Sequence, residues 1–120
     1  LERALKLGDR LSGHWVQGHV DGLGTLSAIR PASDDCTELE FELPRELARQ
    51  CVTKGSITIQ GVSLTLNSVL AGADGRGRVP VMISPHTWSA TALSELKVGD
   101  PVAIETDILA KYMERLCKKD

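Results

Sequence analysis

Two alternating runs of opposite phase meet in Ile57-Thr58-Ile59-Gln60-Gly61-Val62-Ser63-Leu64-Thr65-Leu66. Before Gln60 the apolar residues occupy odd positions, and after Gly61 they occupy even positions. Such alternation is typical of half-buried strands, whose successive side chains point to opposite faces of a sheet. Because a one-residue slip exchanges the two faces of a strand, this segment predicts two strands joined by a tight turn or bulge at Gly61.

A second alternating strand is predicted over Cys36–Leu43. Its apolar residues are Leu39, Phe41 and Leu43, and they alternate with Glu38, Glu40 and Glu42. We interpret the glutamates as a solvated face. Pro44 ends this strand, and residues 45–51 can form a short helix with the proline near its start.

The remaining pattern predicts an all-β fold. Further strands are expected at His14–Val20, Gly24–Ile29, Arg78–Ser84 and Val102–Asp107, with turns at Asp21-Gly22, Gly72–Gly77 and Val98–Pro101. Short strands at this spacing indicate a small antiparallel barrel. Near the C-terminus, Leu109, Tyr112, Met113 and Leu116 form one apolar stripe of a helix. We expect this amphipathic helix to dock on the outside of the barrel or on another chain.

The composition is that of one ordinary globular domain. The chain has 120 residues, of which 42% are hydrophobic and 25% charged, and the net charge is −2. This balance gives no reason to expect nucleic acid or a membrane as a partner. Two Trp, one Tyr and one Phe are the aromatic residues, so the core is expected to be aliphatic. The three cysteines lack a CxxC spacing, which predicts reduced thiols in a cytoplasmic protein.

His14 and His19 are poorly spaced for a metal site. Five residues apart, their side chains point to opposite faces of a strand, and on a helix they lie roughly 140° apart. We therefore predict no metal. His19 follows Gly18, and two interpretations stay open for it: a hydrogen-bonded barrel residue, or a proton acceptor with a pKa of about 6.5.

Ser63 and Thr65 lie two residues apart, so on a strand their hydroxyl groups share a face. That face is either simply the wet side of the strand or a row of hydroxyl groups that lines a polar site. Asp107 comes between a predicted strand and the C-terminal helix, where it can serve as the N-cap.

Three ordered segments resemble the second barrel of the riboflavin synthase family. Gly13-His14-Trp15-Val16-Gln17-Gly18-His19-Val20-Asp21-Gly22 is similar to the family's G-H-x-x-x-G-H-x-D-G. Lys54-Gly55-Ser56-Ile57-Thr58-Ile59-Gln60-Gly61-Val62-Ser63-Leu64-Thr65 is similar to K-G-x-I-x-x-D-G-x-S-L-T, with Gln60 in place of the acidic residue. Pro85-His86-Thr87, Thr91, Leu93 and Gly99-Asp100 follow the P-x-T-x-x-x-T-x-L…G-D pattern.

The resemblance implies a six-stranded antiparallel Greek-key barrel with short helices and a C-terminal amphipathic helix. Residues 1–10 would be the remnant of an interdomain linker, residues 11–107 the lumazine-binding barrel and residues 108–120 an oligomerisation helix. The chain, which begins at Leu1 rather than Met, would then lack a first barrel. In this family the active site lies between the first barrel of one subunit and the second barrel of another, usually in a trimer.

The activity implied by the resemblance is the conversion of two molecules of 6,7-dimethyl-8-ribityllumazine into riboflavin and 5-amino-6-ribitylaminouracil, without cofactor or metal. The matching positions give His19, Ser63 and Thr65 catalytic roles. Lys54, Ile83, Thr87 and Asp107 match positions that bind the substrate. The alternative is a non-catalytic lumazine- or flavin-binding protein of the same fold.

Overall fold

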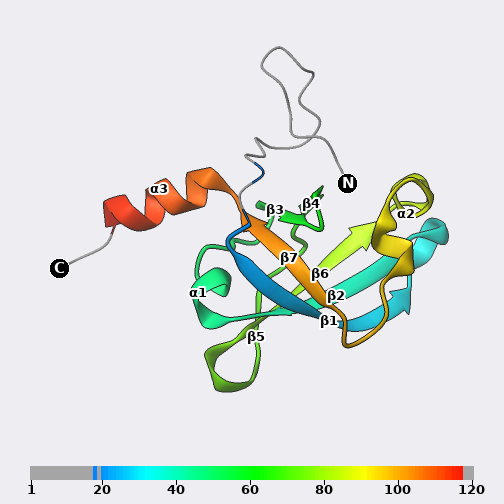
Figure 1. Ribbon diagram of the computed structural model, residues 1–120, viewed down its shortest axis with the longest axis horizontal. Helices are drawn as coiled ribbons and strands as arrows, with labels where there is room; N and C mark the ends of the chain where they lie inside the picture. Colours follow the sequence, from blue (N-terminus) through cyan, green and yellow to red (C-terminus); the bar gives the residue numbers. More distant parts are fainter. Residues whose placement is uncertain (1–17, 19, 118–120) are drawn as a thin grey trace, which may run out of the picture.

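The protein is an antiparallel β structure with short helices. The computed structural model in Figure 1 describes residue 18 and residues 20–117. The strands within these residues are β1 (Gly22–Pro31), β2 (Thr37–Leu43), β3 (Ser56–Ile59), β4 (Val62–Thr65), β5 (Leu70–Ala71), β6 (Gly77–Ile83) and β7 (Pro101–Thr106). The helices are α1 (Arg45–Ala48), α2 (Pro85–Ala90) and α3 (Ile108–Cys117), with 3₁₀ turns η1 (Ser33–Asp35), η2 (Ala73–Gly75) and η3 (Ala92–Glu95).

All seven described strands belong to one sheet, in the order β4-β3-β7-β1-β2-β6-β5. A single bridge between Leu66 and Val81 connects the residue after β4 to β6, so strands from opposite ends of this order meet. The all-β class and the antiparallel pairing are confirmed. The described residues form seven strands rather than six, because the two-residue strand β5 is separate from β4. Full barrel closure and the Greek-key connection stay predictions.

The predicted turn at Gly61 is confirmed as a two-residue hairpin loop. Ile59 pairs with Val62, and the intervening Gln60 and Gly61 have φ angles of 51° and 79°. Two successive residues in the left-handed region define the type I′ turn, whose twist matches that of the flanking strands. Gln60 also joins β7: its N–H donates to the Ala103 carbonyl at 2.9 Å, and its Oε1 accepts from the Ala103 N–H at 2.6 Å.

The core is aliphatic, as the composition predicts. Phe41 is the one fully buried aromatic side chain in the described part of the chain, and Trp88 packs partly buried against the core. Leu47 of α1 and Leu93 of η3 extend the core beyond the sheet. Its other members are Leu26, Leu39, Leu43, Cys51, Ile57, Ile59, Leu64, Leu66, Val79, Val81, Ile83, Val102 and Ile104.

The register of the sheet repeats along the chain. Leu26 is paired with Phe41, and Leu66 is paired with Val81 at the same separation along the chain. In the same way, the pair Arg30 and Glu38 corresponds to the pair Leu70 and Arg78. Hydrogen bonds repeat as well. The Gly99 N–H donates to the Leu26 carbonyl at 2.8 Å, just as the Lys54 N–H donates to the Leu66 carbonyl at 2.9 Å. The described sheet thus consists of two halves with equivalent pairing.

Pro80 explains why the second half carries two short strands where the first half has β1. It lies within β6, opposite Glu40 of β2, and has no N–H to donate toward its other neighbour. The Pro80 carbonyl still accepts a hydrogen bond from the Asn67 N–H, at 3.3 Å. Regular pairing therefore stops near Asn67 and resumes at β5.

Several sequence-based boundaries need correction. Gly22 begins β1, so Asp21-Gly22 is not a turn, and the helix predicted over residues 45–51 ends at Ala48. Of the strand predicted at residues 14–20, only Gly18 and Val20 are described, and neither belongs to a strand. The rest of that strand and the predicted linker at residues 1–10 lie outside the described residues.

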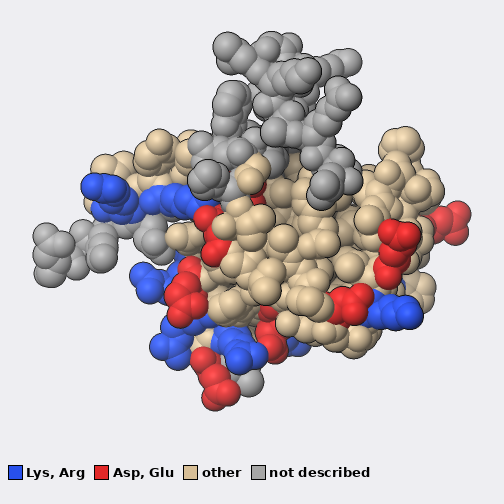
Figure 2. All heavy atoms as spheres, viewed as in Figure 1, with Lys and Arg blue, Asp and Glu red and all other residues tan. Residues whose placement is uncertain are grey.

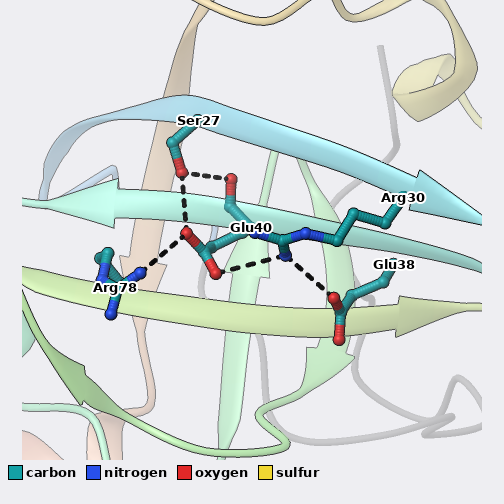
Figure 3. A network of polar contacts seen from close by, with 5 residues as sticks. All are labelled: Ser27, Arg30, Glu38, Glu40 and Arg78. Atoms are coloured by element: carbon teal, nitrogen blue, oxygen red, sulfur yellow. Dashed lines mark hydrogen bonds and ion pairs between the residues drawn. The ribbon is translucent and has the colours of Figure 1, made fainter.

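The interpretation of the three glutamates of β2 as a solvated face is also wrong. Glu40 is only 6% exposed, and Figure 3 shows its carboxylate between Arg30 and Arg78. Arg30 lies 3.4 Å from Glu40 Oε1, Arg78 lies 3.5 Å from Glu40 Oε2, and the Ser27 hydroxyl donates to the Glu40 carbonyl at 3.0 Å. Glu38 pairs with Arg30 at 3.0 Å and Glu42 with Arg76 at 2.8 Å. Sequence alternation identifies the outward face but not its ionic partners.

Helix α3 forms as predicted and runs away from the sheet in Figure 1. Leu109, Tyr112 and Leu116 of the predicted stripe are 67%, 59% and 80% exposed, whereas the side chain of Met113 is not among those described. The oligomerisation role of this helix stays a prediction. Acidic and basic side chains are interspersed on the face shown in Figure 2. In the described part of the chain, no helix is long and apolar enough to cross a membrane.

We expect Glu40→Gln to lower the free energy of unfolding by about 2 kcal/mol, because hydrogen bonds to a buried charged group are worth roughly 1.5–3 kcal/mol. Urea denaturation measures this loss. The matched control is Glu46→Gln, at an exposed position of α1, which should change stability by less than about 0.5 kcal/mol. Equal effects of the two substitutions would contradict a structural role for the Glu40 network.

Candidate functional site

Four hydroxyl side chains lie on one face of the β3–β4 hairpin. Antiparallel pairing sets Thr58 opposite Ser63 and Ser56 opposite Thr65. Directly opposed residues share a face of the sheet, with Cβ atoms roughly 4.5–5.5 Å apart. Ser63 and Thr65 therefore share a face, as their spacing predicts, and Ser56 and Thr58 double the number of hydroxyl groups on it.

These hydroxyl pairs continue across β7 as two polar rows. Thr58 pairs with Glu105, which gives a first row of Ser63, Thr58 and Glu105. The register of Ile57 with Thr106, extended by one position, sets Asp107 beside Ser56 and gives a second row of Thr65, Ser56 and Asp107. Neighbouring strands lie about 4.8 Å apart, so each row spans roughly 10 Å. We call this surface the polar face of β4-β3-β7.

The first row ends at Glu105, which contacts Gly18, the residue before His19. Thr58 is 3% exposed and Glu105 is 5% exposed, so this part of the polar face is shielded from solvent. The Gly18 N–H donates to Glu105 Oε1 at 3.0 Å. His19 itself lies outside the described residues, but the residue before it is attached to the polar face.

Lys54 lies at the end of the second row in a strained backbone conformation. Its φ angle is 71°, and its N–H bonds to the carbonyl of Leu66, the residue after Thr65. Gly99 occupies the equivalent position in the other half of the repeat, and glycine adopts its positive φ angle without strain. A lysine in the left-handed region costs roughly 1 kcal/mol, and such strain points to a role for the side chain. The Lys54 side chain is exposed, consistent with its predicted contact with substrate.

Asp107 is the N-cap that its position predicts. Its Oδ1 accepts from the Leu109 N–H at 3.0 Å, and its carbonyl accepts from the Lys111 N–H at 3.3 Å. Asp107 Oδ2 has no protein partner among the described residues, so the cap leaves one carboxylate oxygen for a ligand hydroxyl. Capping and substrate binding are therefore compatible roles.

Ile83 and Thr87 lie on the other side of β4. The register of Leu66 with Val81 places Ile83 beside Leu64 of β4, and its side chain is 1% exposed in the core. The side chain of Ile83 therefore offers little surface to a ligand. Thr87 is in the first turn of α2, where its N–H donates to the Ser84 hydroxyl at 3.2 Å. The binding roles of Ile83 and Thr87 stay predictions.

Asp21 is a polar residue that the sequence-based prediction missed. Its Oδ2 accepts from the Thr106 N–H at 2.8 Å and from the Thr106 hydroxyl at 3.2 Å, and it lies 2.9 Å from Lys111 Nζ. Partial burial acts to raise the pKa of Asp21, but the Lys111 and Thr106 donors outweigh it and hold that pKa below its ordinary value of 3.8. The signal in the sequence was the aspartate two residues after His19.

Among the described residues, no group of three or more His, Cys, Asp and Glu side chains is placed to hold a metal ion. Burial raises the pKa of the Cys51 thiol to about 11, so this cysteine stays protonated near neutral pH. The hydroxyl, carboxylate and ammonium groups of the polar face can instead bind a neutral polyol or heterocycle through hydrogen bonds.

Asp21→Asn should be less stable than the wild type by about 1 kcal/mol at neutral pH, because it loses a charge-assisted acceptor. The contribution of a carboxylate with a lowered pKa is complete above its unfolded pKa and is lost as the pH falls through its folded pKa. The difference between the two proteins should therefore begin to shrink near pH 3.8 and vanish only below the lower pKa of the folded protein. Thermal unfolding as a function of pH measures it, and a constant difference at all pH values would contradict the assignment.

Known proteins are similar in sequence to this chain over almost its full length. The riboflavin synthase of Mycobacterium tuberculosis is 45% identical over 118 residues, which cover 98% of this chain and 57% of that protein. The riboflavin synthase of Bacillus subtilis is 38% identical over 119 residues, which cover 99% of this chain and 53% of that protein. The chain thus spans about half the length of the curated relatives it matches.

A solved structure shares the fold. The crystal structure of LumP complexed with 6,7-dimethyl-8-(1'-D-ribityl) lumazine matches with a TM-score of 0.67 and 20% identity, covering 82% of this chain and 52% of that one. The family model described as the lumazine binding domain matches residues 17–107, which include β1 to β7 and the whole polar face. The chain therefore belongs to the lumazine-binding domain family.

Proposed function

We propose that this chain supplies one half-site of a riboflavin synthase. The bound substrate is one molecule of 6,7-dimethyl-8-ribityllumazine, and the first barrel of a neighbouring subunit binds the second molecule, as in a trimer of full-length chains. The similarity to riboflavin synthases over 98% of the chain supports the reaction. The observation that supports the proposal is the polar face of β4-β3-β7, because Ser63, Thr65 and Asp107 share this face with Glu105, which accepts from the Gly18 N–H.

The chemistry needs a proton acceptor and a site that orients the ring. His19 takes a proton from the 7-methyl group of one lumazine, and the resulting carbanion adds to the second ring. A four-carbon unit is then transferred, so two identical molecules give riboflavin and 5-amino-6-ribitylaminouracil with atoms and electrons balanced. No cofactor enters this scheme. An imidazole with a pKa near 6.5 suits this proton transfer at neutral pH.

The other predicted residues bind and orient the substrate. In this proposal Ser63 and Thr65, which share one face of the hairpin, present hydroxyl groups to the ring. Asp107, whose Oδ1 caps α3, accepts from a ribityl hydroxyl with Oδ2. The exposed ammonium group of Lys54 can donate to a ring carbonyl or a ribityl oxygen. Alignment of two reactants can lower a barrier by roughly 7–11 kcal/mol, so most of the catalysis in this proposal comes from positioning.

We expect saturable binding of 6,7-dimethyl-8-ribityllumazine to the chain, followed by ligand fluorescence. His19→Ala and Ser63→Ala should each weaken binding by about tenfold, because a lost hydrogen bond to a ligand costs roughly 1 kcal/mol or more. Ser94→Ala, at an exposed position of η3, is the matched control and should bind like the wild type. Equal binding by all four proteins would contradict the half-site.

Turnover separates the enzyme from a non-catalytic lumazine-binding protein. The chain alone should form little riboflavin, and addition of the first barrel of a riboflavin synthase should restore the reaction. Binding without turnover in that mixture would favour the non-catalytic alternative.

Lys54→Gly should make the protein more stable and less able to bind lumazine. Glycine relieves the left-handed strain at this position and raises the free energy of unfolding by up to about 1 kcal/mol, while loss of the ammonium group weakens binding by about tenfold. Thermal unfolding and lumazine titration measure the two effects. Asp34→Gly, at a φ of 58° in η1, is the control that places glycine at another left-handed position and leaves binding unchanged. A Lys54→Gly protein that binds like Asp34→Gly would exclude Lys54 from the site.

A further inference from the structure

Gln60 binds β7 at the point where its own backbone leaves β3. It is the first residue of the loop between β3 and β4, and the preceding pair, Ile59 with Ile104, sets it opposite Ala103. In a regular antiparallel ladder, a hydrogen-bonded pair of residues exchanges two bonds through the two backbones. The first of these bonds is present here, because the Gln60 N–H donates to the Ala103 carbonyl at 2.9 Å.

The second bond of this pair comes from a side chain. The Ala103 N–H donates to Gln60 Oε1 at 2.6 Å, where a continuing strand would offer the backbone carbonyl of residue 60. Gln60 has the left-handed conformation that the two-residue loop requires, with a φ of 51°. The chain can therefore turn back into β4 while the pair with Ala103 keeps both of its hydrogen bonds. The amide oxygen of Gln60 thus extends the β3–β7 ladder by one pair.

This last pair lies beside the first row of the polar face. Thr58 precedes Gln60 by two positions and pairs with Glu105 of β7, and Ser63 lies opposite Thr58 in the hairpin. Thr58 and Glu105 are buried, whereas Gln60 is exposed at the loop. Local opening begins at exposed loops with few buried contacts. The bond at Gln60 is therefore the outermost restraint that keeps the loop end of the hairpin, and Ser63 with it, aligned with Glu105.

We propose that Gln60 is a positioning residue, whose side-chain oxygen holds the β3–β4 loop on β7 and thereby fixes Ser63 in its row on the polar face. Gln60 acts through the backbone of Ala103 and does not touch the substrate. The inference rests on the proposed lumazine half-site for its effect on binding, whereas its effect on Ser63 can be measured without ligand.

The experiment compares Gln60→Met and Gln60→Glu with the wild type in the 120-residue chain at neutral pH. Methionine keeps the length of the side chain but has no oxygen, whereas glutamate keeps an acceptor at the same position. Glu95→Met, at an exposed position of η3, introduces the same apolar side chain outside the hairpin and β7. Glu40→Gln, on β2, is the control for a general loss of stability.

Four quantities are measured for each protein. They are the hydrogen exchange rate of the Ala103 amide, the backbone NMR signal of Ser63, the melting temperature and the Kd for 6,7-dimethyl-8-ribityllumazine.

We expect Gln60→Met to exchange the Ala103 amide about fivefold faster, because one ordinary hydrogen bond is lost. The Ser63 signal should shift in the same protein, and lumazine binding should weaken by about fivefold. This loss is smaller than that expected for Ser63→Ala, because the hydroxyl group is displaced and not removed. Gln60→Glu and Glu95→Met should resemble the wild type in all four quantities. Glu40→Gln should melt at a lower temperature with an unchanged Ser63 signal and Kd.

An unchanged Ser63 signal in Gln60→Met would overturn the proposal. So would a Gln60→Glu protein that behaves like Gln60→Met, because the acceptor oxygen would then have no part in the effect. An equal loss of binding in Glu40→Gln would also overturn it, since general destabilisation would account for the loss. If the wild type itself fails to bind lumazine, the proposed function fails, and the Ser63 signal still decides whether Gln60 positions that residue.

Discussion

The register of the β3–β4 hairpin is the constraint on which the site depends. Gln60 and Gly61 adopt the two left-handed conformations of a type I′ turn, which fixes Ile59 opposite Val62 and every pair beyond them. A slip of β3 by one residue would move the hydroxyl groups of Ser56 and Thr58 into the core and its isoleucines onto the surface. Gln60 adds a second restraint by binding both backbone groups of Ala103. An amide oxygen accepts there as a carboxylate would, so replacement of the acidic residue expected by family resemblance preserves the contact.

The repeat in the sheet separates what the fold requires from what the site requires. In each half, a residue that precedes a strand donates its backbone N–H to a carbonyl. The acceptor is the carbonyl of Leu26 in one half and of Leu66 in the other. At the equivalent donor positions the chain has Gly99 and Lys54, and both have positive φ angles. Glycine satisfies the backbone without strain, whereas lysine does not. The proposed role of the Lys54 side chain would account for this asymmetry between two equivalent positions.

The sequence predicted the parts of the structure that depend on local alternation. The strands around Phe41, the turn at Gly61 and the shared face of Ser63 and Thr65 follow from period-two patterns and turn chemistry. Features that depend on partners far along the chain were not predictable in this way. Glu40 looks like a surface residue until the arginines of two neighbouring strands are placed beside it. Asp21 resembled a turn residue because its partners, Thr106 and Lys111, lie more than eighty positions away.

The position of the polar face explains why the proposed reaction needs a second barrel. Aliphatic side chains such as Ile57, Ile59 and Ile104 fill the interior of the sheet, so a ligand can bind only on its outer face. In the proposal, a ring seated at the exposed end of this face, near Lys54 and Thr65, needs a further wall to screen it from water. A carbanion next to an electron-poor ring is readily quenched by water, and exclusion of solvent also strengthens each hydrogen bond to the ring. A second barrel laid over the polar face would supply both the missing wall and the second lumazine. On this reasoning the half-site alone is built to bind, and the complete site is built to react.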